Sequence, residues 1–274
     1  MSQRSPSTMF RVLFPMLLLA LLAGCATPPP AGDKEAWQEY REINDPLEPT
    51  NRAILAFNRG VDAAVLKPAA TAYRDHVPEL VRNMVGNLLD HLRAPVVMLN
   101  DLAQGEVHRA LVMFNRFWLN TALGFGLLDM ASAMGVPGHD EDFGQTLAVW
   151  GVPAGPFVML PLFGPSNPRD TVGRVVDFLA DPFNMWTANT NREQLKFARA
   201  GTLAVDSRAD SLDLIDDLEK TSLDFYAAIR SLYRQRRADE ITNGKGSANQ
   251  PAPGISQIPD KPIFDAALET SRSH

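Results

Sequence analysis

The sequence holds a single cysteine, Cys25, among its 274 residues, so no disulfide can form within one chain. Long apolar runs are also lacking: none after Cys25 reaches the roughly 18 residues that a membrane-spanning helix needs. Basic residues are outnumbered, with 26 Lys and Arg against 32 Asp and Glu. Proteins that bind nucleic acids do so through clusters of Lys and Arg, so the excess of acidic residues argues against nucleic acid as a partner. Stability must therefore come from apolar packing, and any contact with lipid must be apolar.

Signatures of catalysis and metal binding are lacking too. The sequence has no Gly-x-Ser-x-Gly elbow, no phosphate-binding loop and no His-Glu-x-x-His motif, and its 5 histidines are scattered. The best metal candidate is His139-Asp140-Glu141-Asp142, but neighbouring loop residues point in different directions and no second histidine lies at ligand spacing. A solvated acidic loop is the favoured interpretation. We expect no enzyme, no metal and no cofactor.

The one cysteine lies where an export signal ends. Two arginines begin this segment, an apolar stretch follows at residues 12–23, and Leu22-Ala23-Gly24-Cys25 looks like a bacterial lipobox. In a lipobox the cysteine is acylated and becomes the first residue of the mature chain, and two or more acyl chains anchor a protein stably. The alternative, a secreted protein with a stray thiol, is disfavoured because Cys25 falls at the cleavage site. The residue after it is not aspartate, a sorting pattern that favours the outer membrane of a Gram-negative bacterium.

Composition divides the chain into four segments. We expect a signal peptide at residues 1–24, a lipidated tether at 25–36, a helical domain at 37–242 and a disordered tail at 243–274. The tether contains three consecutive prolines, which favour an extended conformation. The tail is rich in Gly, Ser, Asn, Gln and Pro and lacks a sustained apolar period.

Apolar residues recur at helical spacing through the expected domain. One stripe ends towards Pro95 and resumes after it, a second runs from about Val107 to Met130, and a third, at residues 214–232, predicts one long final helix. Asn167 is placed to cap a helix that begins at Pro168. The pattern predicts a mostly α-helical single domain.

The stretch from Gly144 to Gly164 interrupts this pattern, with four glycines and three prolines among apolar residues. Such a composition excludes a regular helix over the whole stretch and predicts a long loop. A short strand pair at about 146–150 and 157–160 fits within it. Apolar loops of this length are unusual and often functional, although a loop packed on the core is equally compatible with the sequence.

The stripe of the helix expected at 107–130 is unusually wide. A helix that is apolar nearly all round is buried either in protein or in lipid. Phe114, Phe117 and Trp118 therefore have two interpretations. They are core residues or, in a protein anchored to a membrane, they face acyl chains, with the indole N–H at the polar boundary.

Several short motifs follow one another in order over roughly residues 44–236. The opening signature comprises Asn44, Asp45, Pro46, Glu48, Asn51, Arg52, Phe57 and Asn58. Later motifs include Tyr73-Arg74-Asp75, Gly86-Asn87-Leu88, Gln104-Gly105, Glu141-Asp142-Phe143-Gly144 and Gly164-Pro165-Ser166. Taken in this order, the motifs resemble the MlaA (VacJ) family of outer-membrane lipoproteins. Thr50 replaces the aromatic or Met residue that is usual in the family, and Lys67 replaces a common Arg, which keeps the charge but loses the planar fork.

The resemblance implies a ring-like helical domain embedded in one leaflet, the periplasmic-facing leaflet of the outer membrane. It implies a central amphipathic channel through which mislocalised phospholipids leave the outer leaflet for a soluble periplasmic carrier, MlaC, so that lipid asymmetry is maintained. It also implies a trimeric outer-membrane porin as a neighbour. Moving a phospholipid breaks no bond, so no catalytic residue is needed. Two alternatives stay open: a porin-associated structural lipoprotein and a phospholipid-remodelling enzyme.

Roles for three sets of residues follow from this resemblance. The signature residues are expected to act mainly as a structural clamp, because Asp45 and Glu48 near a helix start suit its dipole, with headgroup contact by Asn51 and Arg52 as the lesser alternative. The candidate lipid-facing rim comprises Phe114, Phe117 and Trp118. The candidate gating loop, with its glycines as hinges, comprises Gly144, Gly151, Gly155, Phe157, Met159, Leu160 and Gly164.

Overall fold

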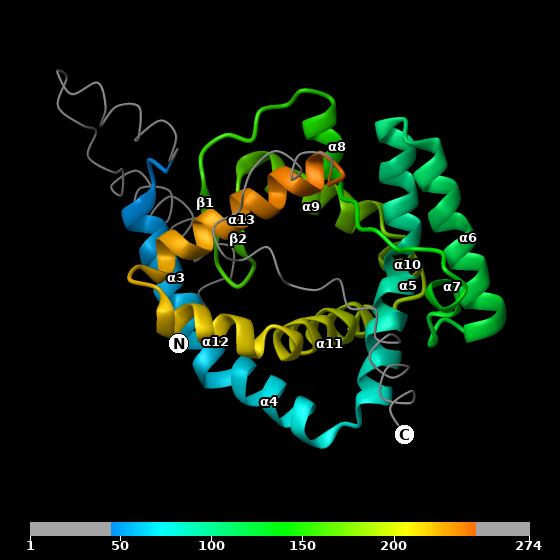
Figure 1. Ribbon diagram of the computed structural model, residues 1–274, viewed down its shortest axis with the longest axis horizontal. Coiled ribbons are helices and arrows are strands. Elements are labelled where there is room, and N and C mark those ends of the chain that lie inside the picture. Colours follow the sequence, from blue (N-terminus) through cyan, green and yellow to red (C-terminus); the bar gives the residue numbers. More distant parts are fainter. Residues whose placement is uncertain (1–44, 245–274) are drawn as a thin grey trace, which may run out of the picture.

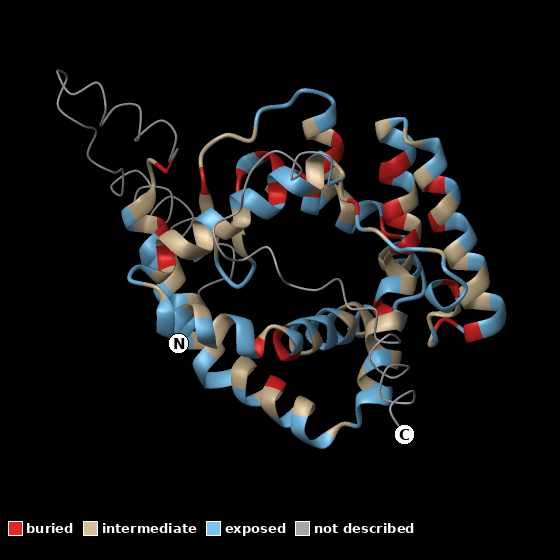
Figure 2. Ribbon diagram, in the orientation of Figure 1, coloured by how far each residue is buried: buried red, intermediate tan, exposed pale blue. Residues whose placement is uncertain are grey.

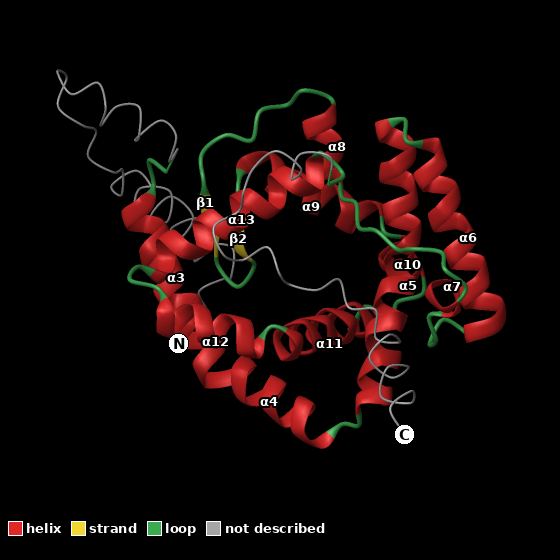
Figure 3. Cartoon of the chain, in the orientation of Figure 1, coloured by secondary structure: helices red, strands yellow, loops and turns green. Residues whose placement is uncertain are grey.

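The computed structural model describes residues 45–244, and these form a ring of helices around a central opening (Figure 1). The expected signal peptide, Cys25, the tether, Asn44 and nearly all of the expected tail lie outside the described residues. Helices dominate, and one short strand pair accompanies them in this part of the chain (Figure 3), which confirms the mostly α-helical prediction. No helix within residues 45–244 is long and apolar enough to cross a membrane.

The first side of the ring is an almost continuous helical rod. It consists of α3 (Glu48–Val61), a π-helical turn η1 (Asp62–Leu66) and α4 (Lys67–His76). The change in winding falls just before Pro68, which has no backbone N–H to donate to the preceding turn. A π turn is a common way to pass such a site without ending the helix.

Helices α5 (Glu79–Gln104) and α6 (Val107–Gly124) form an antiparallel hairpin. Our expectation that α5 is interrupted at Pro95 is wrong, because the helix continues through it to Gln104. Buried residues on both sides of Pro95 pack against α6, and this tertiary contact outweighs the local cost of proline. The helix ends at Gly105, whose left-handed conformation suits glycine.

Helix α6 ends earlier than the expected Met130. Phe125, the residue after Gly124, adopts the left-handed conformation, which stops the helix. A separate short helix, α7 (Met130–Ala133), then begins with Asp129 as its cap.

The segment expected to be a long loop contains more regular structure than predicted. Helix α8 (Phe143–Val149) covers most of the place where a strand was expected, so that part of the prediction is wrong. Strand β1 (Val158–Leu160) lies where the second strand was predicted, but its antiparallel partner is β2 (Gly164–Ser166). Asn167 then caps α9 (Pro168–Ala180) by accepting a hydrogen bond from the Asp170 N–H at 2.8 Å, as predicted.

Four helices close the ring: α10 (Pro182–Asn189), α11 (Gln194–Asp210), α12 (Leu212–Thr221) and α13 (Phe225–Ile241). The single long final helix that we expected is therefore two helices. Asp224 accepts hydrogen bonds from the backbone N–H groups of Tyr226 and Ala227, so it caps α13 and fixes the break.

Buried apolar residues form three small clusters rather than one central core (Figure 2). The first joins α4 to α11 and α12 through Ala70, Ala209 and Leu212. The second joins α5 to α6, and the third joins β1 to α3 and α13. Because packing is confined to the places where neighbouring elements meet, the middle of the ring is left without a core.

Candidate functional site

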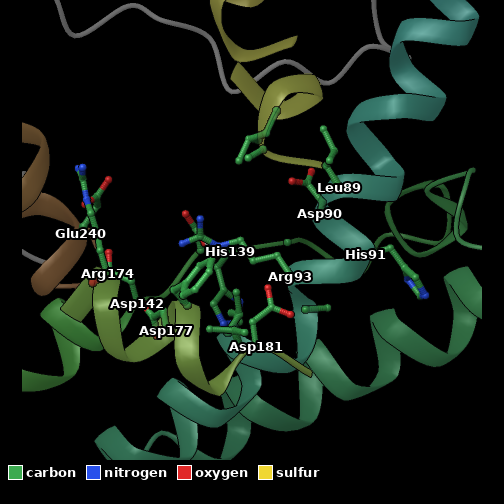
Figure 4. Close-up of a pocket in the computed structure, with 18 of the residues that line it drawn as sticks. Leu89, Asp90, His91, Arg93, His139, Asp142, Arg174, Asp177, Asp181 and Glu240 are labelled. Atoms are coloured by element: carbon green, nitrogen blue, oxygen red, sulfur yellow. The ribbon is translucent and has the colours of Figure 1, made fainter. Parts of the chain in front are cut away.

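The ring surrounds a cavity of about 1190 Å³, lined by helices α5, α6 and α9 to α13, by the turn before α8 and by the tip of the strand pair (Figure 4). This volume exceeds the roughly 300–1,000 Å³ of ordinary small-molecule sites. The lining has an apolar wall, concentrated on α11, α12 and α13, and a charged wall, concentrated on α5, α9 and the turn before α8, although several helices contribute to both.

The apolar wall is formed mainly by α11, α12 and α13. Leu203, Leu214, Ile215, Leu218 and Leu232 line it. Leu203 and Leu214 are among the exposed large apolar residues of the chain although they lie inside the ring. An apolar surface of this kind, open to a large cavity, suits an apolar ligand.

Helix α12 presents these leucines to the cavity because its opposite face is held by charge. Asp213 accepts a hydrogen bond from Arg74 at 2.9 Å, and Asp216 accepts one from Lys67 at 2.8 Å. Glu219 pairs with Arg59 further along the same face. All three cations come from the rod α3–η1–α4, so polar contacts attach the outer face of α12 to the rod and leave Leu214, Ile215 and Leu218 on the side that lines the cavity.

The charged wall comes from α5, α9 and the turn before α8, with contributions from α10, α11 and α13 (Figure 4). Most of its charges neutralise one another in pairs across helices. Arg199 of α11 contacts Asp181 at 2.5 Å, and Arg237 of α13 contacts Asp142 at 2.6 Å. Paired charges of this kind give the wall a polar surface with a small net charge.

The segment His139–Asp142 is part of this wall and not the solvated acidic loop that we expected. Glu141 is fully buried and accepts a hydrogen bond from Arg109 at 2.7 Å. Burial alone would raise the pKa of Asp142, but the guanidinium of Arg237 holds it below its ordinary value. Across residues 45–244, no group of three or more potential ligands is arranged to hold a metal ion.

The signature residues hold the N-terminal helix against β1 and α13. Asp45 is buried and accepts hydrogen bonds from the Tyr226 hydroxyl and from Arg230. Arg52 contacts Asp224 at 2.5 Å, next to the start of α13. These hydrogen bonds and ion pairs therefore join α3, the first described helix, to α13, the last one. Such contacts agree with a role as a structural clamp.

The signature asparagines bind the backbone of the strand pair. Asn51 donates to the Phe157 carbonyl at 3.1 Å and accepts from the Met159 N–H at 2.9 Å. Two helical turns later, Asn58 makes the equivalent two bonds, donating to the carbonyl of Leu160 and accepting from the N–H of Leu162. The spacing of the two asparagines on α3 thus matches the course of β1.

Comparisons with known proteins agree with this architecture. The family model described as MlaA lipoprotein matches residues 43–240. This chain belongs to the MlaA lipoprotein family. It is 35% identical to the intermembrane phospholipid transport system lipoprotein MlaA of Haemophilus influenzae over 84% of this chain and 91% of that one. It is 34% identical to the protein of the same description from Escherichia coli strain K12, over 88% of this chain and 92% of that one.

A solved structure gives the same result for the fold. It is described as "Structural basis for maintenance of bacterial outer membrane lipid asymmetry" and superposes with a TM-score of 0.64 at 35% sequence identity. The match covers 72% of this chain and 98% of the other. The ring is therefore the fold of an MlaA-family protein.

The candidate gating residues of this MlaA-family chain occupy three different environments. Gly144 lies in α8 and not in a loop, and a Cβ built on it would lie 2.5 Å from Arg237. Gly151, Gly155 and Gly164 adopt positive φ angles, which suit glycine, but Gly164 is the first residue of β2 and a Cβ on Gly155 would lie 3.1 Å from Pro168. The remaining three belong to β1 or its approach: Phe157, Met159 and Leu160.

Burial corrects our view of the apolar residues in this segment. Phe157 and Met159 are buried, with Phe157 packed edge-on against Tyr226, so they do not present an apolar surface. Within the strand pair and its turn, the exposed large apolar residues are Leu162 and Phe163, and Phe163 lines the cavity. The tip of the hairpin is therefore the part of the segment that reaches the passage.

Two of the three candidate rim residues are exposed. Phe114 and Trp118 lie on the surface of α6 in an edge-to-face contact, with their ring centres 6.3 Å apart. Phe117 is partly buried, lines the cavity and stacks on His91 at 4.6 Å. The three residues thus lie on two faces of α6.

Sequence reasoning missed the cavity residues of the MlaA-family ring. Nothing in the sequence marked Asp90, Arg93, Arg174 or the inner leucines of α12 as neighbours of one space. The stripe of α12 was recognised, but amphipathic periodicity does not reveal whether the apolar face meets a core or a cavity.

Proposed function

We propose that this chain moves phospholipid out of the outer leaflet of the bacterial outer membrane through its central cavity, without chemical change, and so helps to maintain lipid asymmetry. The observation that carries the proposal is the division of one large cavity into an apolar wall and a charged wall. A phospholipid combines apolar tails with a charged headgroup, so each part finds a matching surface. Relatives of this chain are described as lipoproteins of an intermembrane phospholipid transport system, which supports the same cargo.

The outer surface of the ring supports a location within a leaflet. Large apolar side chains are exposed on many helices, and a monomeric soluble protein rarely exposes so many together. Examples that do not line the cavity are Leu80, Val107, Leu111, Trp118, Val172 and Phe197. We therefore place the ring in the periplasmic-facing leaflet, attached through acylated Cys25, with Phe114 and Trp118 in its lipid-facing rim.

The proposed path ends at a soluble periplasmic carrier of the MlaC type, and the ring is proposed to sit beside a trimeric porin. The hairpin tip at Leu162 and Phe163 is the proposed gate, with Gly151, Gly155 and Gly164 as its flexible points. Its apolar surface at the cavity would give acyl chains a contact as they pass.

A transfer assay tests the proposal. The full lipidated chain is reconstituted in vesicles with labelled phospholipid, and intact labelled lipid on purified MlaC-type carrier is measured over time. Replacing Leu214 and Leu218 by Asn makes the apolar wall polar and should slow transfer severalfold. Leu223→Asn is the matched control, because Leu223 is fully exposed and does not line the cavity. Equal rates in all three proteins would remove the cavity from the path.

The same assay separates the alternatives. Labelled fatty acid or lysolipid in the reaction would favour a phospholipid-remodelling enzyme. Carrier that stays free of lipid, while the chain still binds a porin, would favour a structural lipoprotein. Intact lipid on the carrier supports the transfer function.

A further inference from the structure

The charges that line the cavity are almost completely paired. Eight carboxylates and seven Lys or Arg side chains line it. Six of the carboxylates take part in ion pairs, and Asp177 accepts hydrogen bonds from the Asn100 side chain and the Phe143 N–H. Asp90 is the exception among the eight carboxylates. Its side chain forms neither an ion pair nor a hydrogen bond with any of the described residues.

Asp90 lies one helical turn before Arg93 on α5, and Figure 4 shows both on the side of the helix that faces the cavity. His91, between them in sequence, points away and stacks on Phe117. Residues three apart on a helix are neighbours, with about 5–6 Å between their Cβ atoms. Yet Arg93 contacts Asp140 at 3.0 Å and not Asp90.

The two side chains are also accessible. Asp90 is exposed to the cavity, and the side chains of Arg93 and Asp140 keep 42% and 61% of their accessible surface. The Nε of Arg93, which contacts Asp140, is buried, but the side chain as a whole remains partly accessible, so the rest of the guanidinium can reach a second anion in the cavity. The cavity thus presents an unpaired carboxylate beside a partly accessible guanidinium.

The electrostatic environment destabilises the charged form of the Asp90 carboxylate when no cation is near. Partial burial raises its pKa to about 6, assisted by Asp140, Asp129 and Asp206, while Arg93 acts in the opposite direction. A cation that reached the cavity would therefore find a strong acceptor at this position.

We propose that Asp90 and Arg93 form a headgroup subsite for a zwitterionic phospholipid, in which Asp90 accepts hydrogen bonds from the headgroup ammonium and Arg93 donates to the phosphate. This inference rests on the proposed function, since the lipid must first enter the cavity. An ethanolamine headgroup carries both charges, whereas a glycerol headgroup carries only the phosphate. Asp90 repels the second kind, because it meets no cation there. The leucines of α12 remain available for the acyl chains.

Competitive lipid binding tests the subsite. The full lipidated chain in detergent is incubated with equal amounts of phosphatidylethanolamine and phosphatidylglycerol of the same acyl chains, and bound lipid is identified by native mass spectrometry. We expect the wild type to favour the ethanolamine lipid severalfold and Asp90→Asn to bind the two lipids about equally. The wild-type preference should fall as the pH is lowered through about 6, where Asp90 gains a proton.

Two control variants keep the test decisive. Asp90→Glu keeps the charge and should retain the preference, while Glu79→Gln removes an exposed carboxylate of the same helix that does not line the cavity and should retain it too. A preference that survives in Asp90→Asn, or is lost equally in Glu79→Gln, overturns the subsite. Equal binding of both lipids by the wild type overturns the subsite but leaves the proposed function intact. If the wild type binds neither lipid, the proposed function fails first.

Discussion

The side-chain amide of Asn51 and the backbone of Met159 are joined by a 2.9 Å hydrogen bond between residues 108 positions apart. The same amide donates to the carbonyl of Phe157, so one side chain satisfies backbone groups on both sides of Val158. The side chain of Asn51 and the strand residue Met159 are both buried. A short strand pair with few neighbours is only marginally stable by itself, so this contact fixes it to the ring.

Replacing Asn51 by Ala should destabilise the chain strongly. The change leaves a buried N–H and a buried carbonyl without their partner, and each such loss costs roughly 1–3 kcal/mol. Asn58→Ala is the matched comparison, because Asn58 makes the same two bonds at a more exposed position and should cost less. Unfolding midpoints in urea measure both. A larger effect of Asn58→Ala would contradict our account of the clamp.

Helices α8 and α9 touch backbone to backbone, and Gly173→Ala tests that contact. A Cβ on Gly173 would lie 2.3 Å from the Gly144 backbone nitrogen, so the helices must separate. Overpacking of this kind costs typically about 1–3 kcal/mol.

The matched control is Gly60→Ala in α3, where a Cβ would meet nothing within 4 Å. There alanine should stabilise the helix by roughly 0.5–1 kcal/mol. Thermal unfolding of the two variants should therefore shift in opposite directions. Shifts of the same sign would show that the close crossing is not as described.

The difference in stability between Asp90→Asn and the wild type should depend on pH. The folded chain holds a proton on Asp90 up to about pH 6, whereas the unfolded chain loses it near the ordinary value of 3.8, so wild-type stability falls as the pH rises through that interval. Asparagine has no such loss. At pH 7.5 the variant should melt about 2–4 °C higher, the shift that about 1 kcal/mol produces in a chain of this size, and at pH 4 the two should melt together.

Asp224→Asn should behave in the opposite way. Its hydrogen bond to Arg52 lowers the pKa of Asp224 to about 2, so its contribution is present above the ordinary value and is lost as the pH falls towards 2. Asp224→Asn should be less stable than the wild type at pH 7.5. Calorimetry at pH 7.5 and at pH 4 measures the unfolding of both variants, Asp90→Asn and Asp224→Asn.

The outcome that would contradict the Asp90 prediction is an Asp90→Asn variant that is less stable than the wild type at pH 7.5, because this would show that the Asp90 carboxylate has a stabilising partner.

Cys25→Ala should release the chain from the membrane. The substitution removes the acylated residue and with it the acyl chains that are proposed to attach the ring to the leaflet. Cell fractionation followed by immunoblotting measures the shift from the membrane pellet, and normal lipid asymmetry at normal expression would contradict the anchoring hypothesis.

Local chemistry predicted the parts of the fold that depend on neighbouring residues. The cap at Asn167, the helix start at Pro168 and the helical periods follow from contacts within one turn of helix. The break at Asp224 was equally local, but the apolar stripe that runs across it hid the signal. The continuation of α5 through Pro95 depends on packing against α6, which a single segment does not contain.

The candidate site was less predictable because it is assembled from distant segments. Gly144 looked like a hinge from its place among other glycines, whereas a Cβ at this position would collide with the side chains of Arg237 and Asp170. Leu214 and Leu218 gave an ordinary amphipathic stripe, and only the ion pairs of Asp213 and Asp216 with the rod explain why that stripe meets a cavity. The general role was accessible through the ordered family motifs, and the lining was not.

The ionic attachment of α12 to the rod should make the position of this helix sensitive to salt. Leu212 fixes the start of the helix in an apolar cluster, while Lys67 and Arg74 hold its outer face by exposed ion pairs. Ions in the surrounding fluid screen such pairs and leave the apolar cluster intact. We therefore expect high salt to loosen the far end of α12 more than its start at Leu212, and so to loosen the apolar side of the cavity before the rest of the ring.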